Sequence, residues 1–113
     1  ITTEMVNNLL ISREGKGNKK SVLQIVADYF QLRPEDITGK SRNKTTVLAR
    51  QVTSYVMRQE EDLSFAEIGR ILGNRNHATI IHHYNQIVYG LRTSPALQYK
   101  LLDIKRQLDL SRG

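Results

Sequence analysis

The chain of 113 residues contains no cysteine, so disulfide bonds and thiolate chemistry play no part in it. No apolar run approaches the roughly 20 residues that a helix needs to cross a bilayer, and no segment has the form of a signal peptide. These absences predict a cytoplasmic setting. The first residue is not methionine, and we expect the chain to be a piece of a longer protein.

Acidic side chains are missing from two long stretches. No Asp or Glu lies between Asp36 and Glu60, and none lies between Glu67 and Asp103. The bases in the first stretch are Lys40, Arg42, Lys44, Arg50 and Arg58. The whole chain has 17 Lys and Arg against 11 Asp and Glu, a formal net charge of +6. This balance favours a polyanionic partner, such as nucleic acid or an acidic membrane surface.

The spacing of apolar residues predicts helices and no strands. A short connector helix is expected over residues 1–11 and a linker up to residue 20, which leaves residues 21–113 as one domain with a modest core. Within that domain five series follow the i, i+3, i+4 rule for one buried helical stripe. These series lie at 22–29, 48–56, 65–72, 80–91 and 97–108. Ser94 as N-cap and Pro95 at the first helical position predict the start of the last helix.

A proline and a polar loop separate the first two of these helices. Pro34 disfavours helical geometry in the residue before it and so ends the first helix. A polar, basic loop is then expected at 38–44. In the helix that follows, Arg50, Ser54 and Arg58 recur one turn apart on the side opposite the buried stripe, so we expect the basic groups to share one face.

A short capped helix, a glycine and a polar helix follow one another from Ser64. Ser64 and Glu67 have the spacing of a capping box, in which each side chain satisfies a free backbone N–H group. Gly73 is suited to end this helix, because glycine adopts the left-handed conformation cheaply. The polar stripe of the next helix consists of Asn76, Thr79, His83 and Gln86. Together these segments predict a helix-turn-helix unit.

The three histidines of the chain are His77, His82 and His83. Metal-binding histidines on one helical face are normally three or four residues apart, whereas these are five apart or adjacent. A histidine general base also needs an orienting partner and a nucleophile, and the sequence singles out no such set. We therefore expect neither a metal site nor an enzyme.

In the helix-turn-helix interpretation, the first turn of the second helix enters the major groove. Asn76, His77 and Thr79 then stand at base edges, and the methyl groups of Ala78 and Thr79 are available to the methyl group of thymine. The strand backbone passes His82 and His83 one turn later. From the residues alone, a solvated polar face on an ordinary helical bundle remains the alternative.

Four sequence runs match one known family in order and spacing. They are "VADYFQLRPEDI" before the basic loop, "ARQ" after it, "LSFAEIG", and "IGRILGNRNHATI" at residues 68–80. On these runs the chain resembles the C-terminal DNA-binding domain of the bacterial DnaA replication initiators. The resemblance covers about residues 21–110.

The resemblance implies an all-α helical bundle with a Trp-repressor-like helix-turn-helix motif, which binds short double-stranded origin boxes of the TTATCCACA type. Arg42 matches the arginine that enters the minor groove, where A·T-rich sequence concentrates negative potential. The base-reading positions of the major groove are matched by Asn76, His77, Ala78 and Thr79. The phosphate-binding positions are matched by Arg50, Gln51, Arg58, Ala66, Ile81 and His82. To these we add three further bases as phosphate contacts, Lys40, Lys44 and Arg75.

Three residues depart from the family's pattern. Asn76 stands where aspartate is usual, and its amide can pair bidentately with adenine, whereas an acid favours the amino group of cytosine. Ala78 replaces a threonine and keeps the methyl group without the hydroxyl. Leu48 replaces an arginine, which leaves one phosphate contact unassigned. We therefore expect either that DNA recognition tolerates these changes or that the preferred box sequence is shifted.

The resemblance also implies what the whole protein contains. ATP is expected in a separate ATPase domain of the parent protein, and no cofactor is expected in this chain. The isolated domain is expected to be a monomer, and the parent to oligomerise at the origin, in the cytoplasm and associated with the nucleoid. The alternatives are a free-standing helix-turn-helix transcriptional regulator and, after it, a helical bundle that binds protein.

Overall fold

The computed structural model of the protein describes residues 21–112, and all regular structure in that range is helical. The helices are α2 (Val22–Phe30), α3 (Pro34–Thr38), α4 (Lys44–Glu61), α5 (Phe65–Ile71), α6 (His77–Thr93) and α7 (Pro95–Arg112). The predicted all-α class is confirmed. The connector helix and linker predicted for residues 1–20 lie outside the described part of the chain.

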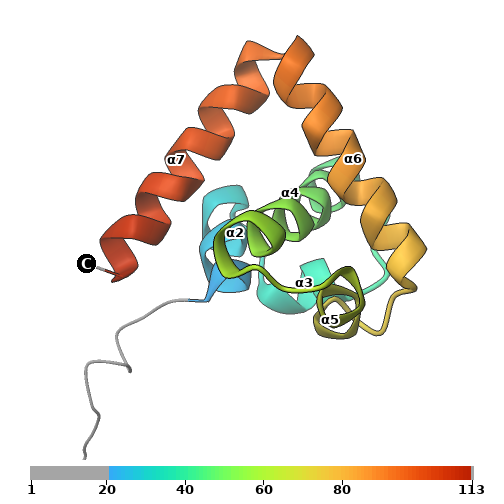
Figure 1. Ribbon diagram of the computed structural model, residues 1–113. Helices are drawn as coiled ribbons and strands as arrows, with labels where there is room; N and C mark the ends of the chain where they lie inside the picture. Colours follow the sequence, from blue (N-terminus) through green and yellow to red (C-terminus); the bar gives the residue numbers. More distant parts are fainter. Residues whose placement is uncertain (1–20, 113) are drawn as a thin grey trace, which may run out of the picture.

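Helix α4 lies at the centre of the fold (Figure 1), where it packs against α2, α3, α5 and α6. The fully buried apolar side chains include Val26, Ala49, Val52, Ile68, Leu72, Ile80 and Ile104. Burial of each large aliphatic side chain contributes about 1.5 to 3 kcal/mol. Because Ile68, Leu72 and Ile80 come from α5 and α6, this core also holds the two helices of the predicted helix-turn-helix unit.

The predicted helix starts are confirmed at two places. The hydroxyl oxygen of Ser64 accepts the N–H of Glu67 at 3.1 Å, and a carboxylate oxygen of Glu67 accepts the N–H of Ser64 at 2.9 Å. The backbone and side-chain bonds from Ser64 lower the pKa of Glu67. Ser94 accepts the N–H of Leu97 at 3.3 Å at the start of α7, and Pro95 is the first helical residue.

Helix α3 was not predicted. Helix α2 ends at Phe30 with the left-handed Gln31 (φ 59°) as its C-cap, so Pro34 is not the residue that ends it. Pro34 instead begins α3, because its fixed φ and missing N–H suit the first position of a helix. The side chain of Asp36 accepts the N–H of Arg33 at 3.0 Å and stabilises this start. The polar loop expected at 38–44 is therefore shorter, and its irregular part runs over residues 39–43.

The basic face predicted for α4 is largely covered in the structure. Arg50 is only 5% exposed and Ser54 is fully buried. The hydroxyl of Ser54 donates to the carbonyl of Arg50 at 3.0 Å, which satisfies it inside the helix. Helix α4 has neighbours on most of its circumference, so polar residues as well as apolar ones are covered, and helical spacing by itself does not reveal this.

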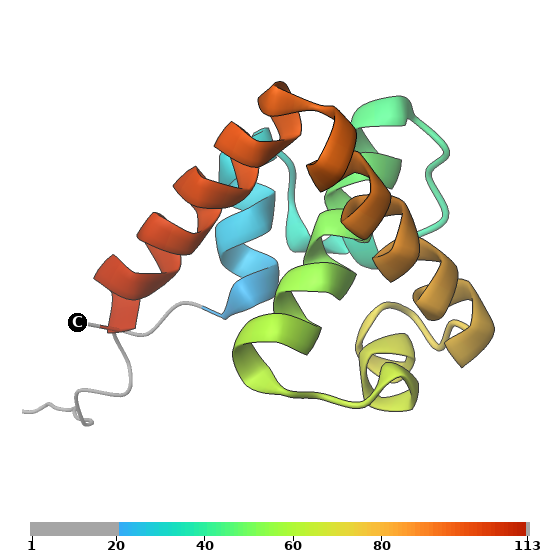
Figure 2. The ribbon, with the colours of Figure 1, turned by 45° about the horizontal axis from the view of Figure 1, so that its top comes forward.

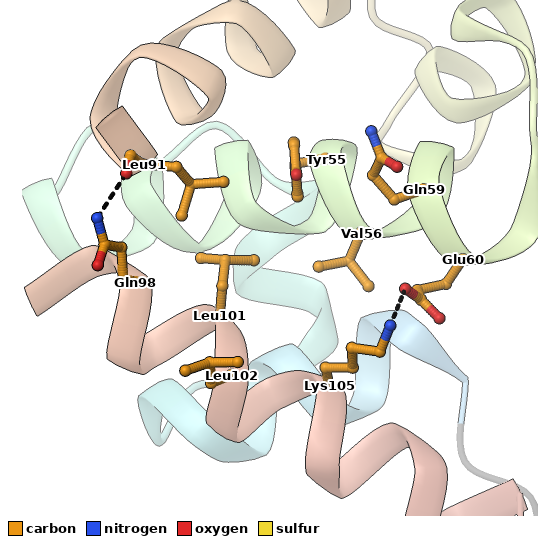
Figure 3. Close-up of a pocket in the computed structure, with 9 residues that line it drawn as sticks. All are labelled: Tyr55, Val56, Gln59, Glu60, Leu91, Gln98, Leu101, Leu102 and Lys105. Atoms are coloured by element: carbon orange, nitrogen blue, oxygen red, sulfur yellow. Dashed lines mark hydrogen bonds and ion pairs between the residues drawn. The ribbon is translucent and has the colours of Figure 1, made fainter. Parts of the chain in front are cut away.

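Helices α6 and α7 form an inverted V above α4 and α2 (Figure 1). A groove of about 410 Å³ lies between α4 and these two helices. Figure 3 shows its apolar lining from Val56, Leu91 and Leu101, with an ion pair of 3.4 Å between Lys105 and Glu60 near one end. The groove is far from the start of α6, because the 14 residues between His77 and Leu91 span roughly 20 Å of helix.

Candidate nucleic-acid interface

The turn between α5 and α6 is built around two glycines. Gly69 lies against the backbone of Arg75, and a β-carbon at Gly69 would collide with the carbonyl oxygen of Arg75. Gly73 has φ of 85°, and a β-carbon there would collide with the carbonyl oxygen of Thr38. The N–H of Arg75 donates to the carbonyl of Gly69 at 2.8 Å. The predicted role of Gly73 in ending α5 is confirmed, and Gly69 is a second requirement of the same turn.

The first turn of α6 faces solvent. Asn76, His77, Ala78 and Thr79 are all exposed, whereas Ile80 directly after them is fully buried. No acidic residue occurs in this turn. The free N–H groups at a helix N-terminus carry partial positive charge, so the exposed surface here is neutral to positive and carries hydrogen-bonding groups.

Asn76 is the N-cap of α6. Its side-chain oxygen accepts the N–H of Ala78 at 2.7 Å. The amide oxygen has a second acceptor site, so the predicted pairing of Asn76 with adenine is compatible with the cap and stays a prediction.

The three histidines lie in different environments. His77 and His82 are exposed, and Ile81 beside His82 is 36% exposed. His83 is half-buried, and its buried Nδ1 has no hydrogen-bond partner among the described residues. His83 is thus a partly covered member of the polar stripe predicted for this helix. Burial first, and then the charges of Arg50, His82 and Arg75, lower the pKa of His83 to about 4.

The basic loop lies on the same side of the molecule as the start of α6 (Figure 2). Lys40, Arg42 and Lys44 are all exposed. Asn43 is the N-cap of α4, and its side-chain oxygen accepts the N–H of Thr45 at 2.9 Å. This cap fixes the end of the loop, while the three basic side chains remain free to meet an anionic partner.

Arg75 joins the turn before α6 to the start of the basic loop. Its Nη1 donates to the carbonyl of Thr38 at 3.1 Å and also to the carbonyl of Leu72, and its Nη2 donates to the carbonyl of Gly39. Burial lowers the pKa of this guanidinium. Three of its five N–H donors are thus used within the fold, so we assign Arg75 a positioning role in place of the predicted phosphate contact.

Arg50 reaches the same loop from α4. Its Nε donates to the carbonyl of Ile37 at 2.8 Å, and its Nη2 donates to the carbonyl of Gly39 at 3.0 Å. Burial, and then the charge of Arg75, lower the pKa of Arg50. The phosphate contact predicted for Arg50 assumed an exposed side chain and is corrected in the same way. The two arginines together supply donors to the end of α3.

The other residues predicted to contact phosphates differ in how exposed their side chains are. Arg58 is half-buried, donates from Nη1 to the carbonyl of Leu63 at 3.0 Å and lies 4.9 Å from the centre of the Phe65 ring. Ala66, in the first turn of α5, is exposed. Gln51 is half-buried. Arg58 therefore fixes the loop before α5 and only part of its guanidinium remains available.

Nothing in the residue pattern indicates that the carbonyls of Thr38 and Gly39 organise this surface. They are backbone groups, and Arg75 lies 37 residues from Thr38. The tight requirement for glycine at Gly69 and Gly73 is the one trace of this packing in the residue types.

Within residues 21–112 no group of three or more His, Asp or Glu side chains is placed to hold a metal ion. No helix in that range is long and apolar enough to span a membrane.

Comparison with known proteins gives one consistent match. Residues 20–87 match the family described as the bacterial dnaA protein helix-turn-helix. The chromosomal replication initiator protein DnaA of Enterococcus faecalis is 36% identical over 114 residues, which cover 96% of this chain and 26% of that protein. DnaA of Lacticaseibacillus casei is 33% identical over 99 residues, 88% of this chain and 22% of that protein. DnaA of Chloroflexus aggregans is 27% identical over 112 residues, 99% of this chain. The chain spans about a quarter of the length of these curated relatives.

Proposed function

We propose, from the premise that the chain belongs to the bacterial DnaA helix-turn-helix family, that it binds double-stranded DNA through both grooves. The first turn of α6 enters the major groove, and the basic loop at 39–43 reaches the adjacent minor groove. The domain acts by binding a specific DNA sequence and not by catalysis, because a helix-turn-helix unit provides groups that contact DNA.

One observation carries this proposal. Asn76, His77, Ala78 and Thr79 form an exposed, acid-free helical turn directly in front of the buried Ile80. The major groove of B-DNA is about 12 Å wide and admits one α-helix. A turn that points outward on a helix anchored by its neighbour Ile80 can therefore present donors, acceptors and methyl groups to base edges.

The link between turn and loop supports reading of two grooves at once. Arg75 hydrogen-bonds to the carbonyls of Thr38 and Gly39, which precede the exposed Lys40 and Arg42. A fixed distance between the two reading elements lowers the entropy that is lost on binding. Arg42 then enters the minor groove, where the negative potential of A·T-rich sequence attracts a guanidinium.

The phosphate contacts fix the register of the protein and carry no sequence information. We assign them to the exposed or partly exposed positions Lys40, Lys44, Gln51, Arg58, Ala66, Ile81 and His82. Arg50 and Arg75 support the loop and the turn from inside the fold instead. The acid-free stretch between Asp36 and Glu60 keeps repulsion away from these contacts.

For the parent protein we propose initiation of chromosomal replication at origin boxes of the TTATCCACA type. The relatives are named as chromosomal replication initiators and are about four times as long as this chain. Such a parent carries an ATP-binding domain outside this chain, and several copies assemble at the origin in the cytoplasm, in association with the nucleoid. The domain by itself binds a single box as a monomer.

The test is fluorescence anisotropy of a labelled TTATCCACA-type duplex and a scrambled duplex, each titrated with the protein at two salt concentrations. We expect tighter binding to the box and a steep fall in affinity with salt, because each phosphate contact releases a counterion. Equal affinity for both duplexes would contradict the proposed preference for the box sequence. An affinity that does not change with salt concentration would contradict the proposed phosphate contacts.

A further inference from the structure

We propose that the segment of residues 1–11 docks as a helix on the outer side of α7, where an exposed apolar stripe adjoins the groove between α4, α6 and α7. The stripe consists of Tyr99, Leu102 and Leu110. The inference concerns an interaction surface and its occupant. It does not depend on the proposed DNA contacts, because the groove lies far from the start of α6.

Helix α7 has apolar side chains on two sides. Ile104 and Leu108 are buried in the core, whereas Tyr99, Leu102 and Leu110 are 72%, 59% and 71% exposed. The three exposed positions lie within about 80° of one another around a helix of 3.6 residues per turn. Leu102 also lines the groove (Figure 3), so the stripe and the groove meet at this residue. Single exposed apolar side chains are ordinary, but a row of them beside a groove marks a binding surface.

The sequence at 1–11 supplies a matching apolar face. Its large apolar residues recur at helical spacing and include Met5, Val6, Leu9 and Leu10. A helix over residues 1–11 is about 16 Å long, and the stripe from Tyr99 to Leu110 covers about the same length of α7. Isolated helices shorter than about 12 to 15 residues are marginal in water, so this segment needs a surface to hold it. Docking removes both apolar faces from water at once.

The position of α2 puts this segment within reach of the stripe. Figures 1 and 2 both place the start of α2 beside the last turns of α7, and the two helices pack against each other. The residues at 12–20 can span at most roughly 30 Å, which is more than the length of the stripe. A short tether also raises the effective concentration of the segment at α7 to the millimolar range. This favours the segment over a second copy of the chain or another protein.

The experiment is hydrogen–deuterium exchange of the backbone amides of residues 2–11 in the whole chain. We expect exchange about tenfold or more slower than in an unfolded chain, because docking keeps the helical hydrogen bonds closed. Leu102→Asp and Leu110→Asp place a charge on the stripe, and each should restore fast exchange in this segment. Both side chains are exposed, so thermal unfolding of residues 21–112 should show that each variant remains folded. The matched control is Tyr89→Asp on α6, which is 66% exposed outside the stripe and the groove and should keep the slow exchange.

Three results would overturn the docking of residues 1–11 on α7. Fast exchange of this segment in the native protein would show that the stripe is left for another molecule. Protection that grows when the protein concentration is raised about tenfold would assign the stripe to a second copy of the chain. Protection that persists in both folded aspartate variants would place the segment on a different surface. None of these results involves DNA, so the proposed function is tested separately.

Discussion

Arg75 donates a hydrogen bond to the carbonyl oxygen of Thr38, 37 residues earlier in the chain, at 3.1 Å. This bond and the one from Arg75 to Gly39 tie the turn before α6 to the start of the basic loop. Two elements that are distant in sequence and proposed to read different grooves thus share one guanidinium.

Arg75→Ala should lower the free energy of unfolding by about 1.5 to 3 kcal/mol, the range for hydrogen bonds to a charged group. Arg75→Lys should restore little, because an ammonium lacks the planar fork that reaches two carbonyls. Urea denaturation measures both. The matched control is Arg106→Ala, an exposed arginine paired with Asp103 at 3.1 Å, for which a change within about 0.5 kcal/mol is expected. Equal losses of unfolding free energy in Arg75→Ala and Arg106→Ala would show that the bonds from Arg75 to Thr38 and Gly39 do not stabilise the fold.

Arg42→Ala should weaken DNA binding, whereas Arg50→Ala should lower the stability of the fold. Arg42 is exposed, so its removal should leave unfolding unchanged, weaken DNA binding and reduce the salt slope by about one unit. Arg50 is 5% exposed and bonded to the carbonyls of Ile37 and Gly39, so its removal should cost about 2 kcal/mol or more of stability. Denaturation curves and salt titrations of both variants decide the matter. A fully stable Arg50→Ala protein would show that these bonds contribute little.

His77→Ala should weaken binding to the preferred box by about 1 to 3 kcal/mol and relax its specificity, the effect of a lost base contact. Lys44→Ala should instead weaken binding to boxed and scrambled duplexes alike. Both side chains are exposed, so neither change should alter folding. Anisotropy on the two duplexes compares them, and similar behaviour of the two variants would contradict the division between base and phosphate contacts.

Stability should fall as the pH is lowered from about 6.5 toward 4, because of His83. Its pKa is lowered from 6.5 to about 4 in the folded protein, so in this window the unfolded chain binds the proton and the folded one does not. The loss at pH 5 should be about 1 kcal/mol after allowance for its half-exposed ring. Urea denaturation at pH 7 and pH 5 measures it. His83→Gln should remove this part of the pH dependence, and an unchanged profile in that variant would assign it to other groups.

The helix-turn-helix unit was visible in the residue pattern for a local reason. Its capping box, its left-handed Gly73 and the apolar positions Ile68 and Ile80 lie within a few turns of each other. Interactions at that range depend on residue type and spacing, which the sequence gives directly. Helix α3 was missed because the sequence pattern treats Pro34 only as a helix breaker, whereas proline is also favoured at the first position of a helix.

By itself the sequence determined the helical class, the capped starts of α5 and α7, the family, and the exposed residues at the beginning of α6. Tertiary structure alone decided which of the basic side chains are exposed to solvent and which are buried. Arg42 and Arg50 look alike in a basic stretch, yet one faces solvent and the other is covered. The physical reason is that buried carbonyl groups need donors, and whether an arginine supplies them depends on which helix ends the fold brings beside it. Only the structure likewise showed that the side-chain oxygen of Asn76 caps α6.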